Sequence, residues 1–247
     1  MTADWPYPSV FAHRGGGKLA PENTLAAIHL GQSLGFRAHE FDVKLSKDKV
    51  SLLLHDATLE RTTNGKGLVR NFNYRELSAL DAGSWFGKEF AGEPIPLFES
   101  VAAFLIERGV WANVEIKPCT GRDDVTGETV ALEARRLWRG ASLPPLLSSF
   151  SVAALRAARA AAPELPRGWI VRALPDGWRQ TMQELEGVSM NCDIRRLTRD
   201  TAREVRDAGY ALRAWTVNDP AMAREAFSWG VDSIVTDRLD IITPDFA

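Results

Sequence analysis

Arg37–Lys44, with the sequence RAHEFDVK, carries the pattern that decides the fold. Apolar residues alternate in it with the carboxylates Glu40 and Asp42, which is typical of a β-strand whose successive side chains point to opposite faces. A helical pattern over Glu22–Leu34 precedes this strand and stops at Gly35, and glycine is common just past the end of a helix. A helix that leads into a buried strand is the repeating unit of an α/β protein.

The same unit recurs along most of the chain. Further strand patterns lie at Val10–Arg14, Trp111–Lys117, Leu146–Phe150, Arg167–Arg172, Val188–Asp193, Ala211–Val217 and Asp232–Asp237. Further helical patterns lie at Phe98–Arg108, Val152–Ala161, Thr201–Ala208 and Ala221–Trp229. This alternation predicts an α/β fold, a single (β/α)₈ TIM barrel over residues 1–247. The main alternative, an open doubly wound sheet, would need a G-x-G-x-x-G turn, and Gly15-Gly16-Gly17 lacks that spacing.

The alternation breaks after Lys44. Ser46–Lys49 reads as a turn and Val50–His55 as another strand, and the gap is too short for a parallel crossover. We therefore expect an antiparallel hairpin. Pairing Leu45 with Val50 in that hairpin would place Asp42 opposite Leu53 and Glu40 opposite His55.

The segment at about 56–96 is irregular, and we predict that it forms a small inserted cap after the hairpin. Its aromatic side chains would either cover the site or make a small core of their own. They are Phe72, Tyr74, Trp85, Phe86 and Phe90.

Composition excludes several classes of partner. Lys and Arg number 30 against 32 Asp and Glu, for a net charge of -2, so we expect neither nucleic acid nor stable membrane association. Met1–Val10 has no signal-peptide pattern, and Cys119 and Cys192 lack metal-site spacing and are expected to be free thiols. We expect a cytoplasmic protein that acts on a small molecule, and the sequence carries no signal for an oligomeric state.

The first strand ends at His13, which leads into Arg14 and three glycines. Catalytic groups of TIM barrels lie at the carboxyl ends of the strands, and glycines allow a close approach of the backbone to a ligand. Arginine can hold a phosphate through paired N–H donors. His13 alone is equally consistent with a hydrogen-bonded histidine in a tight loop.

Carboxylates gather on two strands. Glu40 and Asp42 share one face of the first, and Glu115 with Lys117 repeats the spacing on the next. Neighbouring carboxylates repel each other and are costly to desolvate, and a divalent cation removes both problems. Glu115 is thus a candidate third ligand and Lys117 a candidate cation for phosphate, whereas a solvated hairpin face and a Glu–Lys surface pair are the alternatives. Oxygen ligands favour Mg²⁺ or Ca²⁺.

The remaining histidines differ in position. His55 ends the second hairpin strand and could give or take a proton near neutral pH, as a partner of the first histidine. His29 lies on a polar helix and His39 on the face opposite Glu40, so we expect both to be structural. Trp215, at the end of a late strand, either forms an apolar wall for a substrate or belongs to the core.

Taken together, these residues resemble the glycerophosphodiester phosphodiesterases, above all their cytoplasmic bacterial members that accompany glycerol 3-phosphate uptake. Five blocks carry the resemblance along the full chain: His13-Arg14-Gly15-Gly16 with Pro21-Glu22-Asn23-Thr24, Glu40-Phe41-Asp42-Val43, His55-Asp56 with Leu59–Gly65, Glu115-Ile116-Lys117, and Trp215-Thr216-Val217-Asn218. Departures from the family pattern at Arg37-Ala38-His39 and in Val188–Asp193 bear on substrate detail and not on the reaction.

The resemblance implies a TIM barrel with a small insertion after the second histidine, and hydrolysis of glycerophosphodiesters to sn-glycerol 3-phosphate and an alcohol. It implies one divalent metal ion, Mg²⁺ or Ca²⁺ with Mn²⁺ or Co²⁺ as further options. The residues that it implies are His13 and His55 as the acid–base pair, Glu40, Asp42 and Glu115 at the metal, and Arg14 and Lys117 at the phosphate. A related lyase or phospholipase and an inactive binding relative are the alternative functions.

Overall fold

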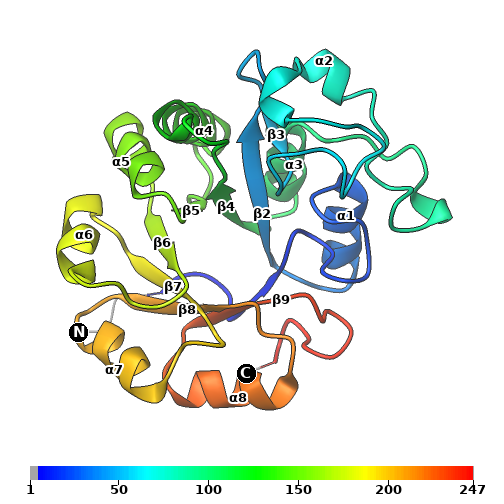
Figure 1. The fold of residues 1–247 in the computed structure, drawn as a ribbon. Helices are drawn as coiled ribbons and strands as arrows, with labels where there is room; N and C mark the ends of the chain where they lie inside the picture. The colour runs from blue at the N-terminus through cyan, green and yellow to red at the C-terminus, as the bar shows by residue number, and fades with distance from the viewer. Residues whose placement is uncertain (1–4, 247) are drawn as a thin grey trace.

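The structure, a computed structural model, describes residues 5–246, and these form a closed barrel of eight parallel strands ringed by helices (Figure 1). The strands are β1 (Val10–Ala12), β2 (Ala38–Leu45), β4 (Trp111–Ile116), β5 (Leu146–Ser149), β6 (Arg167–Val171), β7 (Ser189–Asp193), β8 (Ala211–Trp215) and β9 (Ser233–Thr236). Strand β1 pairs with both β9 and β2, which closes the barrel. The predicted (β/α)₈ fold is confirmed.

The outer helices lie between consecutive strands. They are α1 (Leu25–Ser33), α3 (Phe98–Glu107), α4 (Asp123–Leu137), α5 (Val152–Ala161), α6 (Trp178–Leu185), α7 (Arg199–Asp207) and α8 (Pro220–Ser228). The sequence patterns located five of them to within about three residues, but they did not delineate α4 and α6. Helix α4 is polar over most of its length, and its ends are stabilised by charge, with Asp123 and Asp124 in the first turn and Arg135 and Arg136 in the last.

The predicted hairpin forms between β2 and β3 (Ser51–Leu53), but its register is one residue away from the predicted one. Leu45 pairs with Ser51, not with Val50. The expectation that Glu40 lies opposite His55 is therefore wrong, and His55 lies in the loop beyond the end of β3.

The turn explains this shift. The backbone N–H of Ser46 donates to the carbonyl of Val50 at 3.0 Å, and the N–H of Val50 donates to the Ser46 hydroxyl at 2.9 Å. Ser46 and Val50 thus close a loop of three residues, in which Lys49 has a left-handed backbone conformation with φ 65°. A left-handed third residue is characteristic of such three-residue hairpin loops.

The segment between β3 and α3 lies beside β3 and α1, outside the ring of strands (Figure 1). It contains the short helices η1 (Val69–Asn71), α2 (Tyr74–Leu77) and η2 (Lys88–Phe90). Phe72 and Tyr74 pack into a small apolar core of this segment, as one of the two alternatives expected, whereas Trp85, Phe86 and Phe90 contact one another edge to face. That the whole chain forms one domain with this segment as an inserted cap stays a prediction.

Apolar side chains fill the layer between the strands and the helices in two large clusters. The interior of the barrel is different, because buried polar side chains from several strands meet there. Arg213 donates to Asn113 at 2.7 Å and to Ser233 at 3.0 Å, and Asn113 donates to Ser148 at 3.0 Å. Among the described residues, no helix combines the length and the apolar character that crossing a membrane requires.

Close packing of α4 on α5 gives a test of the fold. A β-carbon at Gly127 would collide with the backbone carbonyl oxygen of Ala154. At an uncrowded position within a helix, replacing Gly by Ala raises the free energy of unfolding by about 1 kcal/mol. Here we expect Gly127→Ala to lower the free energy of unfolding by about 1–3 kcal/mol, as overpacking does. Urea denaturation measures this change, and Glu128→Ala, at the exposed neighbouring position, is the control. A Gly127→Ala protein more stable than the parent would contradict the packing described.

Candidate active site

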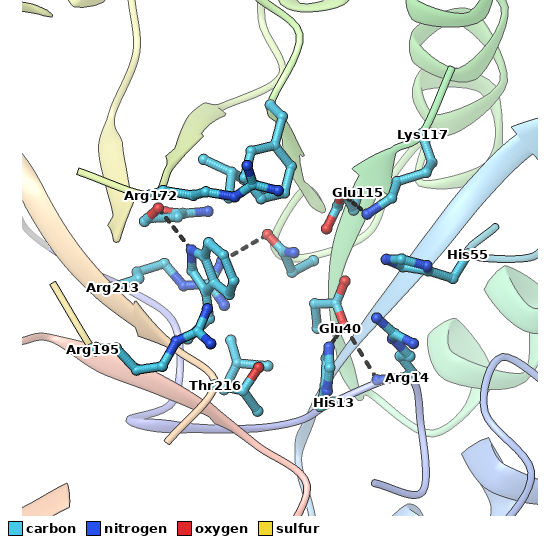
Figure 2. Close-up of a pocket in the computed structure, with 16 residues that line it drawn as sticks. His13, Arg14, Glu40, His55, Glu115, Lys117, Arg172, Arg195, Arg213 and Thr216 are labelled. Carbon is cyan, nitrogen blue, oxygen red and sulfur yellow. Dashed lines mark hydrogen bonds and ion pairs between the residues drawn. The ribbon is translucent and has the colours of Figure 1, made fainter. Parts of the chain in front are cut away.

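A cleft of about 420 Å³ lies over the carboxyl ends of the barrel strands (Figure 2). Most of the side chains singled out in the sequence line it: His13, Arg14, Glu40, His55, Glu115, Lys117 and Trp215. Asp42 is not a lining residue, because it lies beneath the others and is only 1% exposed. The structure therefore brings together residues that lie on five separate strands or the loops after them.

The three carboxylates form one cluster. Asp42 on β2 pairs in register with Glu115 on β4, and Glu40 lies two residues before Asp42 on the same face. One oxygen from each of the three lies within 4.8 Å of the others. All three residues are buried, with exposed fractions of 5%, 1% and 8% for Glu40, Asp42 and Glu115.

The chemistry of this donor set fits a divalent cation. Burial and the charge of Asp42 raise the pKa of Glu115 to about 7, and the same two causes raise the pKa of Glu40. The positive charges of the protein alone thus do not fully offset the negative charge of the three carboxylates. Hard divalent cations take oxygen ligands of this kind, so Glu40, Asp42 and Glu115 could hold a metal ion.

Two cations of the chain also reach the cluster. Lys117 Nζ lies 2.6 Å from Glu115 Oε1 and 3.2 Å from Asp42 Oδ1, and Arg14 Nε lies 3.6 Å from Asp42 Oδ2. Burial alone would raise the pKa of Asp42, but these two charges outweigh it and hold that pKa well below its ordinary value. The surface-pair alternative for Glu115 and Lys117 is excluded, because Glu115 is buried within the cluster.

Asn23 is a supporting residue to which the sequence analysis gave no role. Its backbone is left-handed, with φ 59°, and its side-chain amide donates to Asp42 Oδ2 at 2.8 Å. The same amide accepts the backbone N–H of Asp42 at 3.0 Å. These contacts keep Asn23 outside α1, which begins only after Thr24, whose hydroxyl accepts the N–H of Ala27.

His13 is held by a carboxylate from the last strand. Its Nδ1 lies 2.5 Å from Asp237 Oδ1, and its Nε2 lies 3.7 Å from Glu40 Oε2. Burial opposes the charged ring, but the hydrogen bond with Asp237 and the charge of Glu40 raise the His13 pKa above its ordinary value. Asn218 donates to Asp237 Oδ2 at 2.9 Å and so orients this carboxylate.

His55 is held in a similar way from the inserted segment. Its Nδ1 lies 2.6 Å from Asp56 Oδ1, and Arg61 binds both Asp56, at 2.6 Å, and Glu22, at 2.7 Å. Burial lowers the pKa of His55 despite the opposing charge of Asp42. Nδ1 of each histidine is thus hydrogen-bonded to an aspartate, which leaves Nε2 for proton transfer. Aspartates orient catalytic histidines in other enzymes in the same way.

The two other histidines lie apart from the cleft, as expected. His29 is exposed on α1, where its ring lies tilted against Phe104 with the ring centres 4.3 Å apart. His39 is fully buried beneath α1, close to Gly31.

The wall of the cleft that faces the carboxylates was missed by the sequence analysis, apart from Trp215. The Trp215 indole N–H donates to the Asn191 carbonyl at 3.0 Å, and its ring meets Phe150 edge to face at 5.4 Å. Arg172, Arg195 and Arg213 complete this wall. Most of these residues lie at or just after the ends of β5 to β8, so the rule that barrel sites form at strand ends could have identified them.

Comparisons with known proteins agree with this geometry. The chain matches the glycerophosphoryl diester phosphodiesterase family over residues 13–241. It is 34% identical to a glycerophosphodiester phosphodiesterase of Caldanaerobacter subterraneus, over 92% of this chain and 93% of that protein. It superposes with a TM-score of 0.87 and 35% identity on a phosphodiesterase of Oleispira antarctica in complex with the product sn-glycerol 3-phosphate, over 93% of each chain.

A further solved relative is a glycerophosphodiester phosphodiesterase of Agrobacterium tumefaciens, at 30% identity and a TM-score of 0.80, over 97% of this chain and 98% of that one. The matches to these relatives thus extend over nearly the whole chain.

The carboxylate cluster predicts a stabilising effect of divalent metal. A cation at about one hundred times its dissociation constant adds about 2.7 kcal/mol to the folded state, which should raise Tm by roughly 5 to 10 °C for a chain of this size. Glu40→Gln should abolish most of that rise, and it should not lower the metal-free Tm, because it removes a like charge beside Asp42. Differential scanning calorimetry with Mg²⁺, Mn²⁺ and Ca²⁺ measures both effects.

The matched control is Glu107→Gln, which removes an exposed carboxylate on α3 and should keep the full rise. An equal rise in the Glu40→Gln and Glu107→Gln proteins would show that the cluster does not bind the ion.

Proposed function

The chain belongs to the glycerophosphoryl diester phosphodiesterase family, and from this premise we propose that it hydrolyses glycerophosphodiesters to sn-glycerol 3-phosphate and an alcohol. The observation that carries the proposal is the cleft in which two aspartate-bound histidines flank a buried cluster of three carboxylates. The product bound to the Oleispira antarctica relative supports the choice of sn-glycerol 3-phosphate.

One divalent ion is part of the proposal, held by Glu40, Asp42 and Glu115. When bound, such an ion offsets negative charge on a phosphate and lowers the pKa of a substrate hydroxyl. Mg²⁺ and Ca²⁺ suit the oxygen ligands best, and Mn²⁺ and Co²⁺ are further options.

The histidines are proposed to move the protons. His13 and His55 both line the cleft, and each keeps one ring nitrogen free of its aspartate. One ring takes the proton of the attacking hydroxyl and the other gives a proton to the leaving alcohol. A glycerol hydroxyl next to the ester is the proposed nucleophile, since an intramolecular attack gains from proximity, and water then opens the cyclic phosphate.

Arg14 and Lys117 are proposed to hold the phosphate, and Trp215 to contact the carbon skeleton of the substrate. Both cations line the cleft beside the carboxylates, and each can release part of its present pairing to a phosphate oxygen. Trp215 stands on the facing wall, where its ring is partly exposed. The phosphodiester would thus lie between the two walls.

Release of glycerol 3-phosphate from glycerophosphocholine tests the proposed function directly. We expect turnover with at least one of Mg²⁺, Mn²⁺, Co²⁺ and Ca²⁺, and loss of turnover in excess chelator. Mass spectrometry of the products separates hydrolysis from a lyase reaction, in which the phosphate would stay cyclic. The absence of product with all four ions would support a binding protein instead.

The histidines are tested by substitution. His13→Ala and His55→Ala should each lower kcat by about 100-fold or more, because each removes a proton-transfer group. His29→Ala is the matched control, since His29 is exposed on α1 and should keep full activity. Steady-state kinetics on glycerophosphocholine measures all three, and near-normal kcat in both the His13 and His55 variants would refute the acid–base roles.

A further inference from the structure

The two walls of the cleft differ in charge. One wall holds the carboxylate cluster with Lys117 and Arg14, and the facing wall holds three arginines, which we name the arginine wall: Arg172, Arg195 and Arg213 (Figure 2). Among the described residues that line the cleft, the only carboxylates are Glu40 and Glu115. The arginine wall therefore presents positive charge to the cleft without an acidic lining residue of its own.

Arg213 is the most informative member of this wall. It is only 1% exposed, yet within residues 5–246 no carboxylate forms an ion pair with it. Its Nη1 and Nε donate to Asn113 and Ser233, and its buried Nη2 has no hydrogen-bond partner in the described part of the chain. Burial lowers the Arg213 pKa to about 10, so the side chain is still charged near neutral pH. The guanidinium lies over the Phe11 ring, with Cζ 4.3 Å from the ring centre, and it lines the floor of the cleft, where its charge would act on a ligand.

The other two arginines differ in their pairing. Arg195 binds Asp193, with Nη2 2.6 Å from Oδ2, so its charge is largely balanced. Arg172 is exposed and, in the described chain, has neither an ion pair nor a side-chain hydrogen bond. Arg172 at the rim thus supplies a charge without an ion pair in the described chain. Arg213 on the floor supplies a charge that is met by the Phe11 ring and, at longer range, by Glu40.

The carboxylate wall by itself accounts for binding of the phosphodiester group. Lys117 and Arg14 stand beside its three carboxylates, where a divalent ion would add further positive charge, so the groups proposed to bind the phosphate all lie on this wall. Arg172 lies on the opposite wall, and its charge is not paired within the described chain. That charge points to another anionic group in the same ligand.

The aromatic residues of the cleft offer a competing interpretation, since Trp215 and Phe150 could bind a quaternary ammonium such as choline through their ring faces. However, Lys117 Nζ already lies 5.5 Å from the centre of the Phe150 ring. A second cation there would be placed beside Lys117 and across from the arginines, and this like-charge environment disfavours it.

We propose that the arginine wall is a subsite for the alcohol part of the substrate and selects alcohols that carry a second anionic group, a carboxylate or a phosphate. This inference rests on the proposed function, because it assumes that a glycerophosphodiester spans the two walls. Arg172 would meet the anionic group at the rim, and the Arg213 guanidinium would add positive charge from the floor.

A matched pair of substrates tests the proposal. Glycerophosphoserine and glycerophosphoethanolamine differ by a single carboxylate, so the ratio of their kcat/KM values isolates the effect of that charge. We expect glycerophosphoserine to be favoured by about threefold to tenfold, and the ratio to shrink at high salt. A second pair, glycerophosphoinositol 4-phosphate and glycerophosphoinositol, measures the same effect for a phosphate and shows which anion is preferred.

Variants assign the effect to the wall. Arg172→Gln should bring both ratios close to one, by lowering kcat/KM for the anionic member of each pair. Arg196→Gln, an exposed arginine that does not line the cleft, should leave the ratios unchanged. Arg213→Gln should also reduce the ratios. If that buried substitution prevents folding, the comparison of the Arg172→Gln and Arg196→Gln proteins still tests the proposal.

The possible outcomes distinguish this inference from the proposed function. Turnover of all substrates with no preference for the anionic member of either pair, or with a preference for glycerophosphocholine, would overturn this inference and leave the proposed function intact. A preference that persists in Arg172→Gln and Arg213→Gln would also overturn it. No turnover of any glycerophosphodiester with any metal would overturn the proposed function, and this inference with it.

Discussion

The burial of three carboxylates within 4.8 Å of one another is the constraint on which the rest of the site depends. Like charges removed from water repel strongly, so every neighbouring group must either supply positive charge or donate a hydrogen bond. Lys117, after β4, and Arg14 and Asn23, in the loop between β1 and α1, do this. Burial and the charge of Asp42 nevertheless raise the pKa of Glu115 to about 7, so these groups offset the repulsion only in part.

This constraint also explains why the inserted segment lies where it does. Asp56 holds His55, Arg61 holds Asp56, and Arg61 also binds Glu22, which in turn binds Arg14. This chain of charged contacts runs from the inserted segment to the loop after β1 and ends at the carboxylate cluster. The segment therefore contributes to the site by orienting groups that reach the cleft, while its own aromatic residues pack elsewhere.

The strands and the identity of the polar residues could be predicted from the sequence, because side-chain alternation places Glu40 with Asp42 whatever the rest of the chain does. The hairpin register could not be predicted, since the left-handed position of its turn is occupied by Lys49 and not by the glycine or asparagine that usually marks it. The hydrogen-bond partner of His13 also could not be predicted from local sequence patterns. Asp237 is 224 residues away, and only closure of the barrel between β1 and β9 brings the two together.

Closure of the barrel also separates two tasks along its rim. Strands β1 to β4 and the loops after them hold the carboxylates and histidines, whereas β5 to β8 and the loops after them hold the aromatic and arginine residues of the facing wall. The two halves are not independent, because Arg213 binds Asn113 of β4 and Asn218 orients Asp237. Within residues 5–246, no hydrogen bond or ion pair links Arg172 or Arg195 to the carboxylate cluster. Their loops can therefore change the charge presented to the alcohol while the geometry around the phosphate stays fixed, and the family could vary its substrates there without rebuilding the reaction site.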